Sequence, residues 1–211
     1  PLPASLLSHA AAAYRKTLTR RFFGFGPDSL EEDESSYTDE VFFLGLGSAL
    51  ALPVPFDDVV FDLDLTSEFH QLDDGTVEDR PSMRDSFPAI FAADETANLG
   101  VLSLGLRWDT RDSQSNPYGG WHAGAVVDTA FAQTGGEVGA VFTFSAGHVI
   151  LVPGLFHDGG DAGESHPPTD VIALGVSSQA TAGYLPFFWQ PNLGGGQTRR
   201  GYIDGRWRDR A

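Results

Sequence analysis

The stretch VVFDLDLTSEFH, residues 59–70, alternates apolar and polar side chains with a period of two. One face of this stretch would be apolar and consist of Val59, Phe61, Leu63, Leu65 and Phe69. The opposite face would be mostly polar and consist of Val60, Asp62, Asp64, Thr66, Glu68 and His70. Because successive side chains of a strand point to opposite faces of a sheet, this period predicts a β-strand.

Similar alternation recurs along the chain and predicts further strands at 41–52, 101–109, 121–131, 138–152, 170–183 and 202–210, with one more within 8–23. These runs are roughly ten to fourteen residues long, whereas strands of soluble proteins average about five or six. A strand that crosses an outer membrane needs about nine to eleven tilted residues, apolar towards lipid and small or polar towards the lumen. We therefore predict an all-β fold, a transmembrane antiparallel up-and-down β-barrel. A soluble β-sandwich also alternates, and strand length is what favours the barrel.

A membrane-spanning helix is the other alternative for one apolar region. Residues 138–156 contain no Asp, Glu, Lys or Arg and are nearly long enough to span a bilayer. Small and polar residues interrupt this region at Gly139, Thr143, Ser145, Gly147, His148, Pro153 and Gly154. The interruptions favour a strand over a helical span.

Composition excludes several functions. Among 211 residues, 29 acidic side chains outnumber 13 basic ones, giving a net charge of −16, which argues against nucleic-acid binding. The absence of cysteine excludes disulfides and thiolate zinc sites. No Gly-x-Ser-x-Gly, His-Glu-x-x-His or phosphate-loop motif occurs, so we expect neither an enzyme nor a cofactor. The acidic stretch 157–166 matches neither zinc nor calcium spacing, and no metal site is predicted.

Three stretches carry a resemblance to a known family. RRFFGFGPDSLEEDESSYTDE (20–40) is similar to an aromatic-glycine strand end followed by an acidic loop. LGLRWDTRDSQSNPYGGWH (104–122) is similar to a strand that ends in an Asp-x-Arg-Asp turn, and LPFFWQPNLGGGQTRRGY (185–202) to a long loop with an Arg-Gly-aromatic tip. Together they resemble the barrel of the BamA/TamA-type outer-membrane assembly family, also called bacterial surface antigens.

The resemblance implies how much of a barrel the chain covers. Barrels of that family have about sixteen strands, of which residues 1–211 would supply about eight, approximately strands five to twelve. The chain is thus expected to be a partial outer-membrane β-barrel domain that includes a loop, 184–202, docked in the lumen.

The resemblance also implies which residues of this loop matter. In that family the arginine of the loop tip docks against acidic groups on the inner wall, and the matching residues here are Arg200, Gly201 and Tyr202, with Gly194 and Gly195 allowing the loop to bend inward. An arginine taken from water needs an acidic partner. Nearby candidates are Asp204 and Asp209. The chain departs from the family pattern at Arg199, where an aliphatic residue is usual.

A short turn is predicted between two of the strands. Asp109, Arg111 and Asp112 can satisfy backbone groups of the turn and one another, and Pro117 and Gly120 suit the chain reversal. By the resemblance this turn would lie on the periplasmic side, and its residues are expected to be structural.

The function that the resemblance implies is insertion or secretion of proteins at the bacterial outer membrane. The expected partners are outer-membrane lipid, lipopolysaccharide and unfolded outer-membrane protein clients. Two alternatives stay open: the barrel could anchor a surface-displayed patatin-like lipase, or the chain could be a soluble secreted β-sandwich that binds a ligand.

Overall fold

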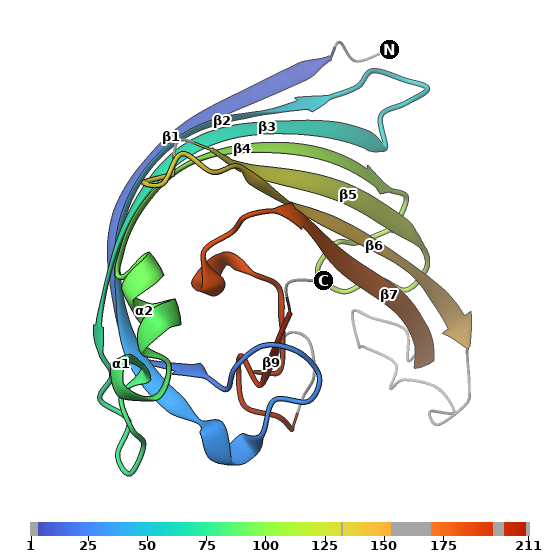
Figure 1. Cartoon of the computed structure of the whole chain (residues 1–211). Coiled ribbons are helices and arrows are strands. Elements are labelled where there is room, and N and C mark those ends of the chain that lie inside the picture. The colour runs from blue at the N-terminus through green and yellow to red at the C-terminus, as the bar shows by residue number, and fades with distance from the viewer. Residues whose placement is uncertain (1–3, 132, 153–169, 196–200, 210–211) are drawn as a thin grey trace.

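A single seven-stranded antiparallel sheet makes up most of the molecule (Figure 1). The computed structural model describes residues 4–131, 133–152, 170–195 and 201–209. The strands follow one another in chain order: β1 (Ser5–Phe22), β2 (Ser35–Ala51), β3 (Val59–Asp74), β4 (Thr96–Asp109), β5 (Gly120–Phe131), β6 (Gly139–Val152) and β7 (Asp170–Gly183). The expected antiparallel up-and-down β architecture is therefore confirmed.

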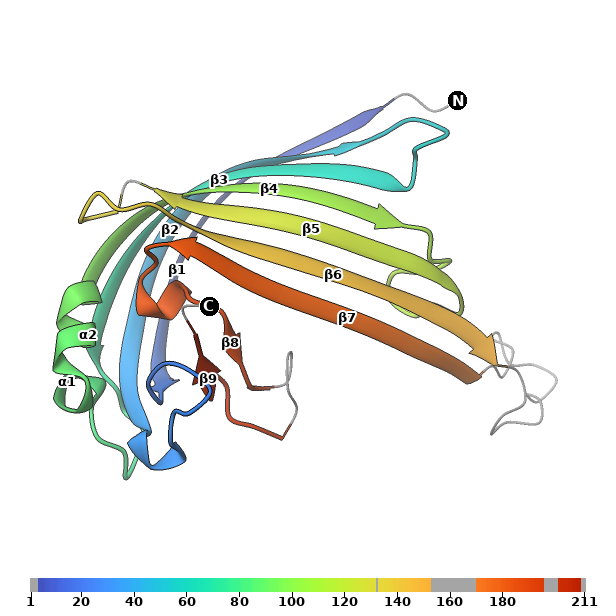
Figure 2. The same ribbon diagram turned by 45° about the vertical axis from the view of Figure 1, so that its right-hand side comes forward.

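The sheet is strongly curved and has one convex and one concave face (Figures 1 and 2). It is open, because β1 and β7 are its two edge strands and do not pair with each other. A closed barrel is thus not formed by the described residues and stays a prediction.

The register of the strands sorts side chains between the two faces. Leu46 lies opposite Leu65, which lies opposite Leu102, so one row of the sheet is aliphatic. The adjacent row consists of Gly47, Asp64 and Ser103, which point to the other face. The aliphatic row is on the convex face and the small, polar row on the concave face, as the alternation of residues 59–70 predicts.

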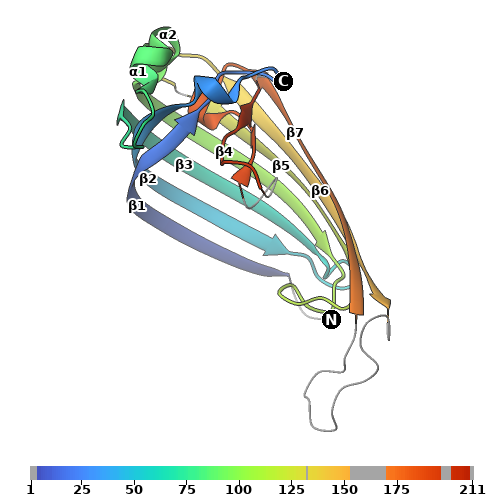
Figure 3. The ribbon, with the colours of Figure 1, turned by 90° about the horizontal axis from the view of Figure 1, so that it is seen from below.

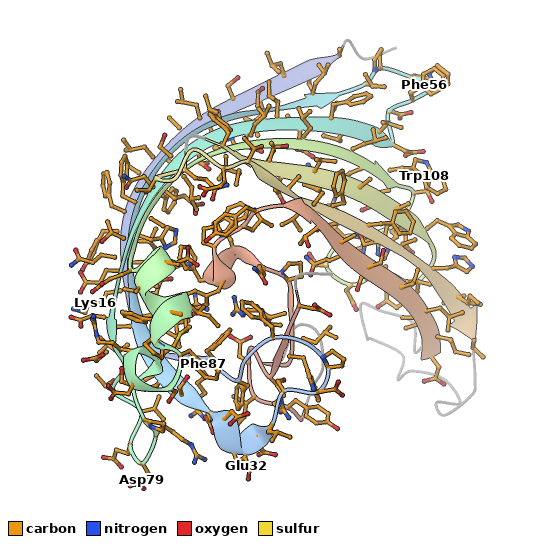
Figure 4. All side chains as sticks on the ribbon, viewed as in Figure 1. Lys16, Glu32, Phe56, Asp79, Phe87 and Trp108 are labelled. Carbon is orange, nitrogen blue, oxygen red and sulfur yellow. The ribbon has the colours of Figure 1, made fainter. Side chains whose placement is uncertain are left out.

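The two ends of the strands differ. At one end, β2 turns into β3 and β4 into β5, and Phe56 and Trp108 lie there (Figure 4). The connections at the opposite end contain the 3₁₀ helix η1 (Glu31–Asp33) and the short helices α1 (Met83–Ser86) and α2 (Pro88–Asp94) (Figure 3). The Ser82 hydroxyl caps α1 by accepting a hydrogen bond from the Arg84 amide, and Pro88 suits the first turn of α2.

The buried core lies at this second end, on the concave side. One cluster consists of Phe22, Tyr37, Leu72, Met83, Phe91 and Phe187. The other consists of Leu99, Val101, Ala130, Val141 and Leu185. Both clusters therefore combine ends of the strands with residues that follow β7. The middle of the sheet contributes little to either cluster.

The structure corrects several predicted boundaries. A full strand at 202–210 is wrong: only β9 (Trp207–Arg208) is extended there, and it pairs with β8 (Asn192–Leu193) outside the main sheet. Gly201 and Gly205 have positive φ angles of 90° and 75°, so the chain turns where the prediction has it extended. The strand predicted at 41–52 begins earlier than expected, since β2 already starts at Ser35.

Region 138–156 is a strand as far as it is described, since β6 covers Gly139–Val152. Within the described ranges, no helix has the length and apolar character needed to cross a membrane. The acidic stretch 157–166 lies outside the described residues.

Candidate functional site: a segment docked on the concave face

Residues 184–195, here called the docked segment, leave β7 and turn onto the concave face (Figures 1 and 2). The turn starts at Gly183, whose φ is 74° and whose hypothetical Cβ atom would lie 2.3 Å from the carbonyl oxygen of Val138. Any larger residue would clash there with backbone atoms. The Tyr184 amide then donates to the same carbonyl over 3.1 Å, which fixes the direction in which the segment leaves the sheet.

Phe187 anchors the docked segment in the core. Its side chain is buried, and its ring meets those of Phe22 and Tyr37 edge-on at centroid distances of 5.3 and 5.2 Å. Such pairs stabilise beyond the area that they bury, and burial of a phenylalanine contributes about 2–3 kcal/mol. Leu185, also buried, packs with the second core cluster. The two residues tie the segment to both clusters.

Asp94, at the end of α2, binds the docked segment through two hydrogen bonds. Its carboxylate accepts from the Phe187 amide over 2.9 Å and from the Tyr184 hydroxyl over 3.1 Å. Asp94 itself is buried. A buried carboxylate is costly unless its oxygens are hydrogen-bonded, so these donors and Asp94 depend on one another.

A second set of polar groups lies where the segment crosses β2 and β3. His70 is 5% exposed, and its Nδ1 and Nε2 atoms lie 2.9 Å from Asp39 and 3.1 Å from Glu68. The Phe188 ring lies against the His70 ring at 4.4 Å, and the Trp189 indole donates to Glu68 over 2.9 Å. We call Asp39, Glu68 and His70 the wall triad. It joins the docked segment to the strands.

Arg208 is the buried arginine that the structure describes in this region. It donates to the carbonyl oxygen of Phe187 and lies beside Tyr37. Burial lowers the pKa of Arg208, and Tyr37 partly opposes that effect. An arginine keeps its proton over the whole physiological pH range. Arg208 therefore places a positive charge in the site, in contact with a backbone carbonyl of the docked segment.

The predicted lumen-loop residues are placed only in part. Gly194 and Gly195 have positive φ angles of 130° and 76°, as an inward bend requires, and the Gly195 amide donates to the Tyr202 carbonyl over 2.9 Å. Gly201 and Tyr202 are exposed, and the Tyr202 ring lies 4.8 Å from that of Trp207. Arg200, and Arg199 before it, lie outside the described residues.

The two acids proposed as partners of Arg200 are both exposed. Asp204 lies close to Gly195, where an added Cβ would come within 3.1 Å of its carboxylate, and Asp209 follows β9. Pairing of either acid with Arg200 stays a prediction.

The turn between β4 and β5 is held by its own polar residues. Arg111 donates to Asp109 through two bonds of 2.8 and 2.7 Å, which raise the pKa of Arg111. Asp112 accepts from the Tyr118 amide over 3.0 Å. Pro117 lies within this turn and Gly120, with a φ of 107°, begins β5. These contacts agree with a structural role for the predicted turn residues.

Ion pairs and hydrogen bonds line the concave face between the two ends. Arg107 binds Asp62 through two bonds of 2.7 and 2.9 Å. His9 lies 3.3 Å from Asp64 across Gly47, where an added Cβ would come within 1.8 Å of the Asp64 carboxylate and 2.4 Å of the His9 ring. The concave face is therefore polar and acidic, and its glycines make room for charged side chains on neighbouring strands.

Sequence reasoning missed the wall triad, Asp94 and Arg208. The polar alternation places Glu68 and His70 on one face, but no local pattern reveals that a segment more than a hundred residues later covers them. Within the described residues there is no group of three histidines, cysteines or acids that could hold a metal ion. The described contacts of the site hold a segment of the chain.

Comparison with known proteins adds no relative. A scan against protein-family models, a search of curated proteins and a search of solved structures each found no match.

Proposed function

We propose that this chain forms part of the wall of an outer-membrane β-barrel, with the docked segment inside the lumen, and that the barrel takes part in inserting or secreting proteins at the bacterial outer membrane. The observation that carries the proposal is the contrast between the two faces of the sheet. The convex face would contact lipid and the concave face would line the lumen.

The convex face exposes a contiguous aliphatic surface. Leu46, Leu63 and Leu104 are 64%, 48% and 52% exposed, and each lies in the middle of a strand. The same strands add Phe61, Leu65 and Leu106, and β6 adds Phe142 and Phe144. Soluble monomers rarely expose so continuous an apolar surface, whereas lipid requires one.

The ends of this surface carry aromatic residues. Tyr14, Phe42 and Phe69 lie on adjacent strands near one end, where the last two rings are 6.3 Å apart. Trp108 and Trp121 are exposed near the other end. Tyr184 and Trp189 follow the end of β7 but lie on the concave side, where they bind Asp94 and Glu68. The convex aromatics are those that support a lipid boundary.

Strand edges set a requirement for the proposal. Hydrocarbon does not tolerate unpaired backbone groups, so β1 and β7 must both be paired in the membrane. In a soluble β-sandwich, by contrast, a second sheet would cover the convex aliphatic face and shield it from water. The polar, ion-paired concave face supports the barrel over the sandwich, since a sandwich buries apolar faces against each other.

The role in protein assembly is supported by the resemblance of residues 20–40, 104–122 and 185–202 and by the segment docked on the concave face. A lipase anchor would use the same wall. The two are separated by depleting the full-length protein from its host and measuring the abundance of other outer-membrane barrels and the release of fatty acid from phospholipid. Assembly predicts loss of other barrels, and a lipase anchor predicts loss of fatty-acid release alone.

The location is tested on the full-length protein by membrane fractionation and gel migration. A barrel would need detergent for extraction and would migrate faster before heating than after. Solubility without detergent would overturn the proposal in favour of the sandwich.

A further inference from the structure

The hydrogen-bond chemistry of the wall triad fixes the proton count of His70. Both ring nitrogens lie within hydrogen-bonding distance of carboxylate oxygens, 2.9 Å from Asp39 and 3.1 Å from Glu68. An ionised carboxylate only accepts hydrogen bonds, and a neutral imidazole has one donor nitrogen and one acceptor nitrogen. The arrangement is therefore satisfied in full only when His70 carries a proton on each nitrogen.

The docked segment uses the same atoms. The Trp189 indole donates to the Glu68 Oε2 atom over 2.9 Å, and that oxygen is also the one that contacts His70. The Phe188 ring covers the His70 ring at 4.4 Å and shields it from solvent. Protonation of His70 and docking of residues 188–189 thus share one carboxylate oxygen and one aromatic contact.

Among the residues that the structure describes, His70 is the one cationic group within ion-pair distance of Asp39 and Glu68. Asp39 from β2 and Glu68 from β3 face His70 directly, and β4 places Ala97 opposite it. Arg15 of β1 acts on Glu68 from a distance. The docked segment itself, residues 184–195, contains no ionisable side chain other than Tyr184, whose hydroxyl binds Asp94.

We propose that His70 is a proton-dependent latch for the docked segment. With its second proton, His70 neutralises the carboxylates and holds Glu68 where Trp189 can bind it. Without that proton, a nitrogen lone pair faces a carboxylate across about 3 Å, the two groups repel, and the segment loses both its hydrogen-bond acceptor and its stacking partner. Raising the pH would then weaken the attachment of residues 184–195 to the wall, leaving Phe187, Leu185 and the Asp94 hydrogen bonds as its anchors, whatever surrounds the convex face.

A cysteine-labelling experiment tests this latch, because the chain has no native cysteine. Leu185→Cys places a thiol at a buried position of the docked segment, and Leu193→Cys places one at a position of the same segment that is 54% exposed. Each full-length protein is treated with a maleimide between about pH 6 and about pH 9. Because both thiols react faster as the pH rises, the ratio of their rates reports exposure of residue 185.

The expected result is a rise of this ratio on the order of tenfold across the range when His70 is present. In a His70→Gln background the ratio should be high and independent of pH, since glutamine cannot gain a proton. The matched control is His122→Gln, on the concave face of β5, which should keep the rise seen with His70.

A ratio that stays constant with pH in the parent protein would overturn the latch, as would an unchanged profile in His70→Gln. If His70→Gln does not fold, as judged by gel migration before heating, Glu68→Gln decides. An amide oxygen can still accept from Trp189, but it holds the His70 proton less strongly, so the ratio should rise at a lower pH. An unaltered midpoint in Glu68→Gln would contradict the proposal.

Discussion

Trp189 and Glu68 are 121 residues apart in the chain, yet the indole nitrogen of one lies 2.9 Å from a carboxylate oxygen of the other. This bond joins the segment after the seventh strand to the third strand of the sheet. Its donor is uncharged and its acceptor is charged, and hydrogen bonds of that type contribute about 1.5–3 kcal/mol. It is therefore a specific tie between wall and segment.

Removing this tie should loosen the docked segment while an aromatic ring still packs against the second core cluster. Trp189→Phe keeps an aromatic ring and deletes the indole donor, so we expect faster protease cleavage between residues 184 and 195. Cleavage rates measured in detergent against the parent protein check this. Trp121→Phe, an exposed position on the convex face, serves as the control and should leave cleavage unchanged. Equal rates for Trp189→Phe and its parent would contradict the role of the bond.

The carboxylate of Asp94 should matter more for stability than an exposed one in the neighbouring helix. Asp94→Asn keeps one oxygen acceptor and replaces the other by an amide donor, so either the Phe187 amide faces a donor or the Tyr184 hydroxyl no longer has an acceptor there; a buried donor left unpaired costs about 1–3 kcal/mol. Urea unfolding followed by circular dichroism measures the loss. Asp85→Asn removes the same charge from an exposed position of α1 and should change stability by no more than about 0.5 kcal/mol. A similar loss for both variants would show that charge alone is responsible.

A charged residue should discriminate between the two faces of β3. Leu65 points to the convex face and Thr66, its neighbour, to the concave one. In lipid vesicles, Leu65→Arg should lower the free energy of unfolding by about 2–4 kcal/mol, the cost of arginine near a bilayer midplane. Thr66→Arg should cost clearly less, because the concave face offers Asp64 and water. Equal costs in the two variants would count against a lipid-facing convex surface.

Glycines of the concave face should differ in their tolerance of a methyl group. At Gly47 an added Cβ meets both Asp64 and His9 at less than 3 Å, so Gly47→Ala must displace that ion pair. We expect a loss of no more than about 1 kcal/mol in thermal or urea unfolding, because both side chains are partly exposed. Gly175→Ala on β7 is the control, since its added Cβ would find only one atom, at 3.8 Å, and it should be neutral or slightly stabilising. An unchanged Gly47→Ala would mean that the two side chains move without cost.

The sheet could be predicted from the sequence because alternation is a local property. The alternation within residues 59–70 is enough to assign each side chain to one face of the sheet. The observed strand β3 starts at the same residue and ends four residues later, at Asp74. The short helices could not be predicted in the same way. Residues 83–94 have no long apolar period, and Met83 and Phe91 become helical in a place where burial against Tyr37 and Leu72 is available.

The residues of the site were harder to predict from the sequence, because their burial depends on contacts with residues that are distant in the chain. The motif at 185–202 directs attention to Arg200, but the buried arginine that the structure describes is Arg208. Its burial depends on Phe187 and Tyr37, which are distant in sequence. The acidic loop near Glu34 shows the same effect, since this residue is buried between Arg21 and Arg80 instead of being solvated. Charge counts do not show which charges find a partner.

The location of both core clusters at one end of the strands has a mechanical consequence. Backbone amides at that rim sit under packed aromatic rings, whereas neither core cluster of the described residues includes Phe56 or Trp108 at the other rim. Local stability should therefore decrease along the strands from the end with the core clusters to the end with Phe56 and Trp108. In hydrogen exchange, the amides near Phe56 and Trp108 should take up deuterium first, and those beside the two core clusters last.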